Sequence, residues 1–282
     1  MEVVLAETAG FCMGVALALK RLDRLLESAE DRPIYILGPI IHNPQVLQRY
    51  AEKGVVMVDR PDQVPTGAYA VIRAHGITRQ VEQSLRERDV KIKDATCPKV
   101  KKAQLLIGGH TDAGSELLLY GEADHPEVAG LVSYAANGFY VFGTEEELEA
   151  HGLSPDKRYI LAAQTTQDRV LFDRIAARLT EDESLDVTVL HTICDATKLR
   201  QAEAKDLAAA VDFMVVVGGY NSGNTRRLAQ VVTDAGTPCR HIETIDDLDL
   251  SELSGHTQIG VTAGASTPRT LIDQVLDSLE SL

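Results

Sequence analysis

The 282-residue sequence lacks tryptophan, has no long basic segment and has no apolar run long enough to cross a membrane. A membrane-spanning helix needs about 20 mainly apolar residues. The densest basic group is Lys99, Lys101 and Lys102, whereas the whole chain has 28 basic against 42 acidic residues and a net charge of −14. Nucleic acids are bound mainly through basic residues that contact phosphates. We therefore expect neither a nucleic-acid partner nor a membrane partner.

Cysteine is also scarce, with four in the chain. Their wide spacing is not typical of a secreted disulfide framework. The start of the chain, Met1-Glu2-Val3-Val4, has no basic region ahead of its apolar residues, as a signal peptide would. These features predict a cytoplasmic protein with reduced thiols, and the 44% apolar fraction is ordinary for a chain with a sizeable core.

Three of the four cysteines occupy the same kind of position, between an apolar strand and a helix. Cys97 follows the alternating segment Val90–Lys93, and Pro98 suits the first turn of the helix behind it. Cys12 and Cys194 have the same setting. The intervals between the three cysteines, 85 and 97 residues, point to an internal repeat.

Polar turns at the ends of other predicted strands follow the same repeat. The first polar turn comes 30, 28 and 28 residues after the three cysteines in order, and the second comes 63, 68 and 72 residues after them. The residues that mark these turns are His42, His125 and Ser222 for the first, and His75, Thr165 and Ser266 for the second.

This repeat predicts an α/β fold of three similar units with mainly parallel sheets, in a pseudo-threefold (trefoil) arrangement around a central cavity. The expected units are residues 13–96, 97–193 and 194–282, the last completed by the N-terminal strand within 1–12. Ligands of parallel sheets gather at the carboxyl ends of the strands, where the cysteines and polar turns lie. We expect Glu145–Lys157 and Asp246–Gly255 to be surface loops.

Three thiolates that converge on one axis suit either an iron–sulfur cluster or a zinc ion. A single cysteine at a strand end is more often a small buried hydrophobe, but the threefold recurrence argues against that interpretation. Cys239 lies on a short strand rather than at a junction, so we expect it to be a packed or free thiol. Three ligands would leave one metal position open.

The polar turns offer helix N–H donors, hydroxyls and imidazoles, a combination that suits phosphate or diphosphate. Each residue alone would be an ordinary helix cap. Glu127 follows Pro126 and is either a favourable charge in a first helical turn or a proton donor, with the hydroxyls of Thr165 and Thr166 as relays. The residues expected at the anion are His42, His75, His125, Ser222, Asn224 and Ser266.

Nine motifs resemble, in sequence order, those of the 4-hydroxy-3-methylbut-2-enyl diphosphate reductase family, which catalyses the last step of the non-mevalonate isoprenoid pathway. The resemblance covers essentially the whole chain. The motifs are Gly10–Val15, Ile41–Asn43, Ala74–Gly76, Asp94–Pro98, His125–Val128, Gln164–Thr166, Thr192–Cys194, Asn221–Asn224 and Thr262–Ser266.

The resemblance implies one [4Fe–4S] cluster per chain, held by Cys12, Cys97 and Cys194, with the fourth iron open to the substrate hydroxyl. Glu127 would donate a proton, with help from Thr165. An external electron donor such as ferredoxin or flavodoxin would supply two electrons, and the products would be isopentenyl and dimethylallyl diphosphates. The residues implied around the diphosphate and the hydroxyl end are His42, His75, His125, Thr165, Ser222, Gly223, Asn224 and Ser266.

Two positions depart from the family pattern. Gly223 stands where many members have a second serine, so a diphosphate contact there must come from the backbone. Asp124 replaces a more usual small residue before His125. The alternative functions are a zinc-dependent phosphohydrolase, although hydrolytic zinc sites more often use histidine and carboxylate ligands, and an iron–sulfur redox sensor, which would need no anion site.

Overall fold

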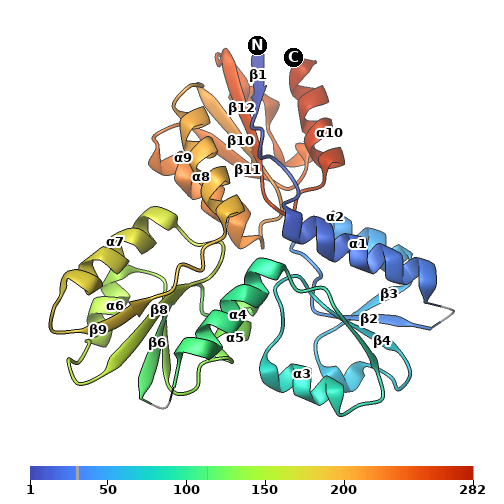
Figure 1. The fold of residues 1–282 in the computed structure, drawn as a ribbon. Helices are drawn as coiled ribbons and strands as arrows, with labels where there is room; N and C mark the ends of the chain where they lie inside the picture. Colours follow the sequence, from blue (N-terminus) through green and yellow to red (C-terminus); the bar gives the residue numbers. More distant parts are fainter. Residues whose placement is uncertain (30–31, 113, 282) are drawn as a thin grey trace. The chain divides into compact units, whose positions relative to one another are not determined.

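A computed structural model describes residues 1–29, 32–112 and 114–281, and these residues contain three four-stranded sheets whose strand pairs are parallel (Figure 1). The chain divides into two compact units. The terminal unit comprises Met1–Ala16, Ile41–Tyr50 and Asp195–Leu282, and the central unit comprises Leu17–Ile40 and Ala51–Cys194. One sheet lies in the terminal unit and two lie in the central unit.

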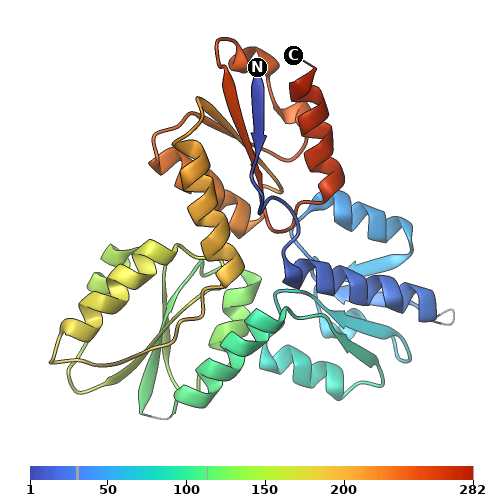
Figure 2. The ribbon, with the colours of Figure 1, turned by 45° about the horizontal axis from the view of Figure 1, so that its top comes forward.

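The sheet of the terminal unit joins the two ends of the chain. Its strand order is β1 (Glu2–Leu5), β12 (Gln258–Ala263), β10 (Phe213–Val217) and β11 (Cys239–Ile242). In Figure 2 the blue β1 lies alongside the red β12, with Val4 in register with Gly260. As predicted, the N-terminal strand completes this sheet.

Both faces of that sheet are buried, which explains why β10 reads as a continuous apolar run. Val215 and Val217 pack on one face with Ile272 and Val275 of α10 (Arg269–Glu280). Met214 and Val216 pack on the other face with residues of α8 (Asp195–Ala208) and α9 (Gly223–Asp234). Alternate side chains of a strand point to opposite faces, so each strand serves two cores.

The first sheet of the central unit has the order β3 (Val55–Val58), β2 (Ile34–Leu37), β4 (Tyr69–Ile72) and β5 (Lys91–Asp94). Along the chain, α1 (Met13–Ser28) precedes β2, α2 (Pro44–Glu52) lies between β2 and β3, and α3 (Arg79–Arg86) lies between β4 and β5. Leu37, Ala70, Ile72 and Leu85 belong to one buried cluster, so α3 covers one face of this sheet.

The second sheet of the central unit has the order β7 (Phe139–Phe142), β6 (Ser115–Tyr120), β8 (Arg158–Ala163) and β9 (Asp186–Val189). α4 (Pro98–His110) and α5 (Pro126–Val132) contribute Ile107 and Leu131 to the cluster on one face. α7 (Arg169–Glu181) contributes Phe172 and Ile175 to the cluster on the other.

The three sheets share one strand order: a short edge strand, the strand before the first polar turn, the strand before the second, and the strand that leads to a cysteine. The predicted α/β class with three similar parallel-sheet units is confirmed. The exact boundaries of the three predicted units stay a prediction.

The prediction that Glu145–Lys157 and Asp246–Gly255 are loops was wrong, because both segments contain helical turns. Residues 145–151 form α6 (Glu145–His151), in which Leu148 is buried. Thr144 caps the helix, and its hydroxyl accepts a hydrogen bond from the Glu147 N–H. In the second segment, the short 3₁₀ helix Ile245–Asp247 overlaps the start and the short 3₁₀ helix Leu250–Leu253 lies within it. A short 3₁₀ helix, Pro61–Gln63, follows β3 in the same way.

No helix in the described part of the chain is long and apolar enough to cross a membrane. Cys239 is half-buried at the start of β11 and packs beside the cluster that includes Leu228 and Val232. Burial raises the pKa of its thiol. Cys239 is therefore a packed thiol, as expected.

Candidate functional site

The three predicted ligand cysteines lie at equivalent points of the repeat, each directly before a helix. Cys12 precedes α1, Cys97 precedes α4 and Cys194 precedes α8. The Cys12 N–H donates to the Ala265 carbonyl at 3.1 Å, the Cys97 N–H to Ala74 at 2.9 Å, and the Cys194 N–H to Thr165 at 3.0 Å. Each acceptor lies two residues beyond the end of β12, β4 or β8. The backbone therefore fixes all three cysteines in the same way.

These positions suit a metal cluster with cysteine ligands. The three thiols are half-buried and none is in a disulfide. Thiolate sulfur is the usual ligand of iron–sulfur clusters, and the amino end of a helix favours negative charge. The donor set and its backbone support fit the cluster predicted from the sequence.

Glu127 is a buried carboxyl group in the first turn of α5, with 2% of its surface exposed. Its two oxygens accept hydrogen bonds from Thr165, one from the backbone N–H at 2.7 Å and one from the hydroxyl at 3.1 Å. Burial raises the pKa of Glu127 to about 7, although the two hydrogen bonds from Thr165 act to lower it. A carboxyl group with this pKa exchanges protons near neutral pH.

His125 lies beside this acid and caps α5. Its Nδ1 accepts a hydrogen bond from the Glu127 N–H at 3.1 Å, so the neutral ring carries its proton on Nε2. The rings of His125 and His75 meet edge to face, with centroids 5.5 Å apart. Within the central unit, the structure thus brings together His75, His125, Glu127 and Thr165.

A second group of predicted residues comes together in the terminal unit. The Ser266 hydroxyl donates to the His42 carbonyl at 3.1 Å and lies 3.3 Å from the Ser222 hydroxyl. Ser222 caps α9, and a Cβ at Gly219 would lie 2.7 Å from the same His42 carbonyl. Glycine at 219 therefore lets the turns of His42 and Ser222 approach each other closely.

Gly223 and Asn224 form the first turn of α9, where backbone N–H groups have no partner within the helix. The Asn224 side chain is buried, yet its Nδ2 donor has no hydrogen-bond partner among the described residues. Leaving a buried donor unsatisfied costs about 1–3 kcal/mol. An anionic ligand at the start of α9 would satisfy it.

Two positioning residues, Gln164 and Asn43, were not singled out from the sequence. The Gln164 side chain accepts from the Glu122 N–H at 3.0 Å and donates to the Thr166 hydroxyl at 3.2 Å, which ties the two polar turns of the second repeat together. Asn43 accepts from the Val46 N–H and starts α2. Both stand in the quoted motifs, where they could have been found. Thr166 contacts Gln164 rather than Glu127, so the hydroxyl beside the acid belongs to Thr165.

The family model described as "LytB protein" matches residues 3–280. The chain belongs to the LytB family. Two relatives named 4-hydroxy-3-methylbut-2-enyl diphosphate reductase, from Nitratidesulfovibrio vulgaris and Solidesulfovibrio magneticus, are 54% and 56% identical over the full length of both chains. A Geobacter relative of the same name is 43% identical, and the match covers all of this chain and 98% of that relative.

Solved structures of the family agree. The E-1-hydroxy-2-methyl-but-2-enyl-4-diphosphate reductase from Plasmodium falciparum matches with a TM-score of 0.92 at 25% identity, covering 99% of this chain and 87% of that one. A second structure, titled as an (E)-4-hydroxy-3-methyl-but-2-enyl diphosphate reductase and terminal enzyme of the non-mevalonate pathway, matches over the whole of both chains at 38% identity, with a TM-score of 0.69. The family predicted from the nine motifs is therefore confirmed.

Proposed function

We propose that this LytB-family chain reduces (E)-4-hydroxy-3-methylbut-2-enyl diphosphate to isopentenyl and dimethylallyl diphosphates. One substrate molecule, two electrons and two protons give one product molecule and one water. The function predicted from the sequence agrees with the names of full-length relatives that are more than half identical. The zinc phosphohydrolase and redox-sensor alternatives are not favoured.

The structural observation that carries the proposal is the buried Glu127–Thr165 pair. With a pKa of about 7, the Glu127 carboxyl is partly protonated at neutral pH and can therefore both donate and recover a proton there. The Thr165 hydroxyl, 3.1 Å from that carboxyl, extends the path of the proton. We assign Glu127 as the donor to the departing hydroxyl and Thr165 as its partner, with His125 fixing the first turn of α5.

We further propose that Cys12, Cys97 and Cys194 hold one [4Fe–4S] cluster with an open fourth iron. When bound, the cluster supplies electrons and a Lewis-acid position for the substrate hydroxyl. The diphosphate is held by the hydroxyls of Ser222 and Ser266, the amide of Asn224, the N–H groups at Gly223, and the imidazoles of the polar turns. The imidazoles are those of His42, His75 and His125. A cytoplasmic location and reduction by ferredoxin or flavodoxin complete the proposal.

The test is anaerobic reconstitution with iron and sulfide, followed by turnover of the hydroxylated diphosphate with a small-molecule reductant. The proposal requires a brown protein, about four irons per chain, and release of both five-carbon diphosphates. A colourless protein that releases inorganic phosphate would establish a hydrolase instead.

A further inference from the structure

α4 is the most basic of the helices in the described part of the chain. It carries Lys99, Lys101 and Lys102 and no carboxylate, in a protein with a net charge of −14. α4 also starts directly after Cys97. A local positive surface therefore adjoins one of the proposed cluster ligands.

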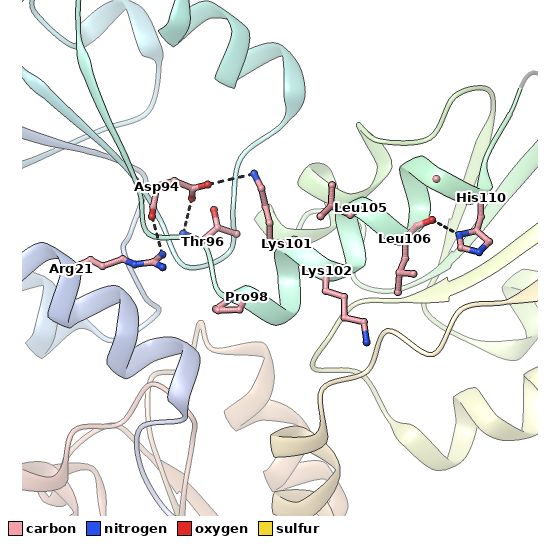
Figure 3. A pocket seen from close by; sticks show the side chains of 10 residues that line it. Arg21, Asp94, Thr96, Pro98, Lys101, Lys102, Leu105, Leu106 and His110 are labelled. Carbon is pink, nitrogen blue, oxygen red and sulfur yellow. Dashed lines mark hydrogen bonds and ion pairs between the residues drawn. The ribbon is translucent and has the colours of Figure 1, made fainter.

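One face of α4 lines an open groove of about 640 Å³ (Figure 3). Its lining residues on the helix recur at intervals of three and four positions, which places them on a single face. The opposite face, with Ala103 and Ile107, is buried in the core. The residues of α4 that line the groove are Pro98, Lys101, Lys102, Leu105, Leu106 and Gly109.

Neighbouring elements extend the positive surface. Arg21 of α1 lies at the edge of the groove and donates to the Asp94 carbonyl at 2.9 Å, and Lys101 pairs with the Asp94 carboxylate at 3.4 Å (Figure 3). A second groove of about 410 Å³ shares Arg21 and Asp94 and adds Arg24 and Lys93. The two grooves form what we call the α4 surface, whose charged groups are Arg21, Arg24, Lys93, Asp94, Lys101 and Lys102.

The α4 surface also includes an exposed apolar residue. Leu105 is 64% exposed on the groove-lining face of the helix, close to the lysines. With a rise of about 1.5 Å per residue, Leu105 lies about 12 Å along the helix axis from Cys97, and Lys101 about 6 Å. Transient electron-transfer complexes are small, and charged groups that steer the encounter contribute more to the association rate than to affinity.

We propose that the α4 surface is the docking site of a small acidic one-electron carrier protein, which delivers electrons beside Cys97. The inference rests on the proposed reductase function, because that reaction consumes two electrons per turnover. Charge complementarity selects the partner: an acidic carrier is repelled by most of this acidic chain and attracted here. Each carrier molecule gives up one electron, so two encounters complete one reduction.

The experiment compares the wild-type holoenzyme with the double variant Lys102→Glu/Arg24→Glu, using a reduced bacterial ferredoxin of acidic net charge as the carrier. Both side chains are exposed and neither belongs to the proposed site. At low ionic strength we expect the KM for ferredoxin to rise about tenfold or more, because steering charges reverse sign. The wild-type KM should itself rise with salt, and that dependence should flatten in the variant.

Two controls separate the possible outcomes. Lys205→Glu, at an exposed lysine of α8, should leave the KM for ferredoxin near the wild-type value. Turnover of the variants with dithionite should match wild type, since no docking is needed. An unchanged KM, an equal loss with dithionite, or a wild type that ferredoxin does not reduce would overturn the docking site. Absence of dithionite-driven turnover in the wild type would instead overturn the proposed function.

Discussion

At the scale of single residues, Glu127 combines burial with two hydrogen bonds from one partner, Thr165. Glu127→Gln keeps the shape and the acceptor for the Thr165 N–H but removes the transferable proton. We expect turnover to fall by about 10²–10⁴-fold, with nearly unchanged substrate affinity and cluster content. Steady-state kinetics and iron analysis of both proteins test this. Asp124→Asn, in the exposed part of the same loop, is the matched control. Near-normal turnover of Glu127→Gln would remove Glu127 from the mechanism.

The raised pKa of Glu127 predicts the pH dependence of the reaction. The carboxyl group must be protonated to act as an acid, so kcat/KM of the wild type should fall above about pH 7. The Thr165 hydroxyl acts to lower that pKa. Thr165→Val should therefore move the alkaline limb to higher pH, and it should reduce turnover less than Glu127→Gln does. The pH–rate profiles of the wild type and Thr165→Val test this shift. An alkaline limb that does not move, or that moves to lower pH, would count against this role of Thr165.

The same shift affects stability. Unfolded Glu127 ionises near its ordinary value of 4.5, whereas the folded group keeps its proton to about pH 7. The native state therefore binds more protons between these values. Its stability falls as pH rises through that window and levels off above it.

At the scale of elements, the start of α9 is the proposed anion site, where a helix terminus lies beside a buried amide. Asn224→Ala should weaken binding of inorganic diphosphate roughly ten- to a hundredfold, because a hydrogen bond to a charged group contributes about 1.5–3 kcal/mol. Ser266→Ala should do the same and also loosen the contact with His42. Calorimetric titration of the holoenzyme measures both affinities.

Asn221→Ala is the control for this prediction, since Asn221 is exposed in the same turn. It should bind diphosphate as the wild type does. If Asn224→Ala lost iron while the remaining holoenzyme kept normal affinity, Asn224 would have a structural role instead.

The sequence predicted the sheets well because several strands, such as Ile34–Leu37 and Phe213–Val217, are short apolar runs that end at a polar turn. It missed α6, whose start is marked by Thr144 and Glu147, a capping pair in which both side chains accept backbone N–H groups. The acidic, mostly exposed helix offers only Leu148 to the core, so hydrophobic periodicity carries little signal there.

The sequence predicted which residues belong to the candidate site but not the contacts between them. Side chains at strand ends could be identified from the repeat alone. The partners of those side chains could not, because the contact between Thr165 and Glu127 joins residues 38 positions apart through two separate turns. The unsatisfied amide of Asn224 likewise depends on burial, which no local pattern specifies.

At the scale of the whole molecule, one supersecondary unit recurs three times, and its fourth strand always leads to a cysteine. The repeat extends to single hydrogen bonds: the N–H of Gly38, Gly121 and Gly218, each directly after a strand, donates to the carbonyl that ends the neighbouring edge strand, at 2.8–2.9 Å. The three repeated units therefore place Cys12, Cys97 and Cys194 in equivalent positions, whereas Cys239 lies on an edge strand. If these three cysteines are the ligands, cluster binding should depend equally on each of them.

This equivalence predicts the behaviour of four serine variants. Cys12→Ser, Cys97→Ser and Cys194→Ser should each lose most of the iron and the visible absorbance after anaerobic reconstitution, because each removes one thiolate ligand. Cys239→Ser should keep wild-type iron and turnover, since its sulfur packs beside α9 and contacts the Ala229 carbonyl there. Iron and sulfide analysis of all four, with melting temperatures as a check on folding, compares them directly. If the cysteines were merely small core residues, the three variants would melt earlier but retain iron. Loss of iron in Cys239→Ser would contradict the inference that the repeat identifies the cluster ligands.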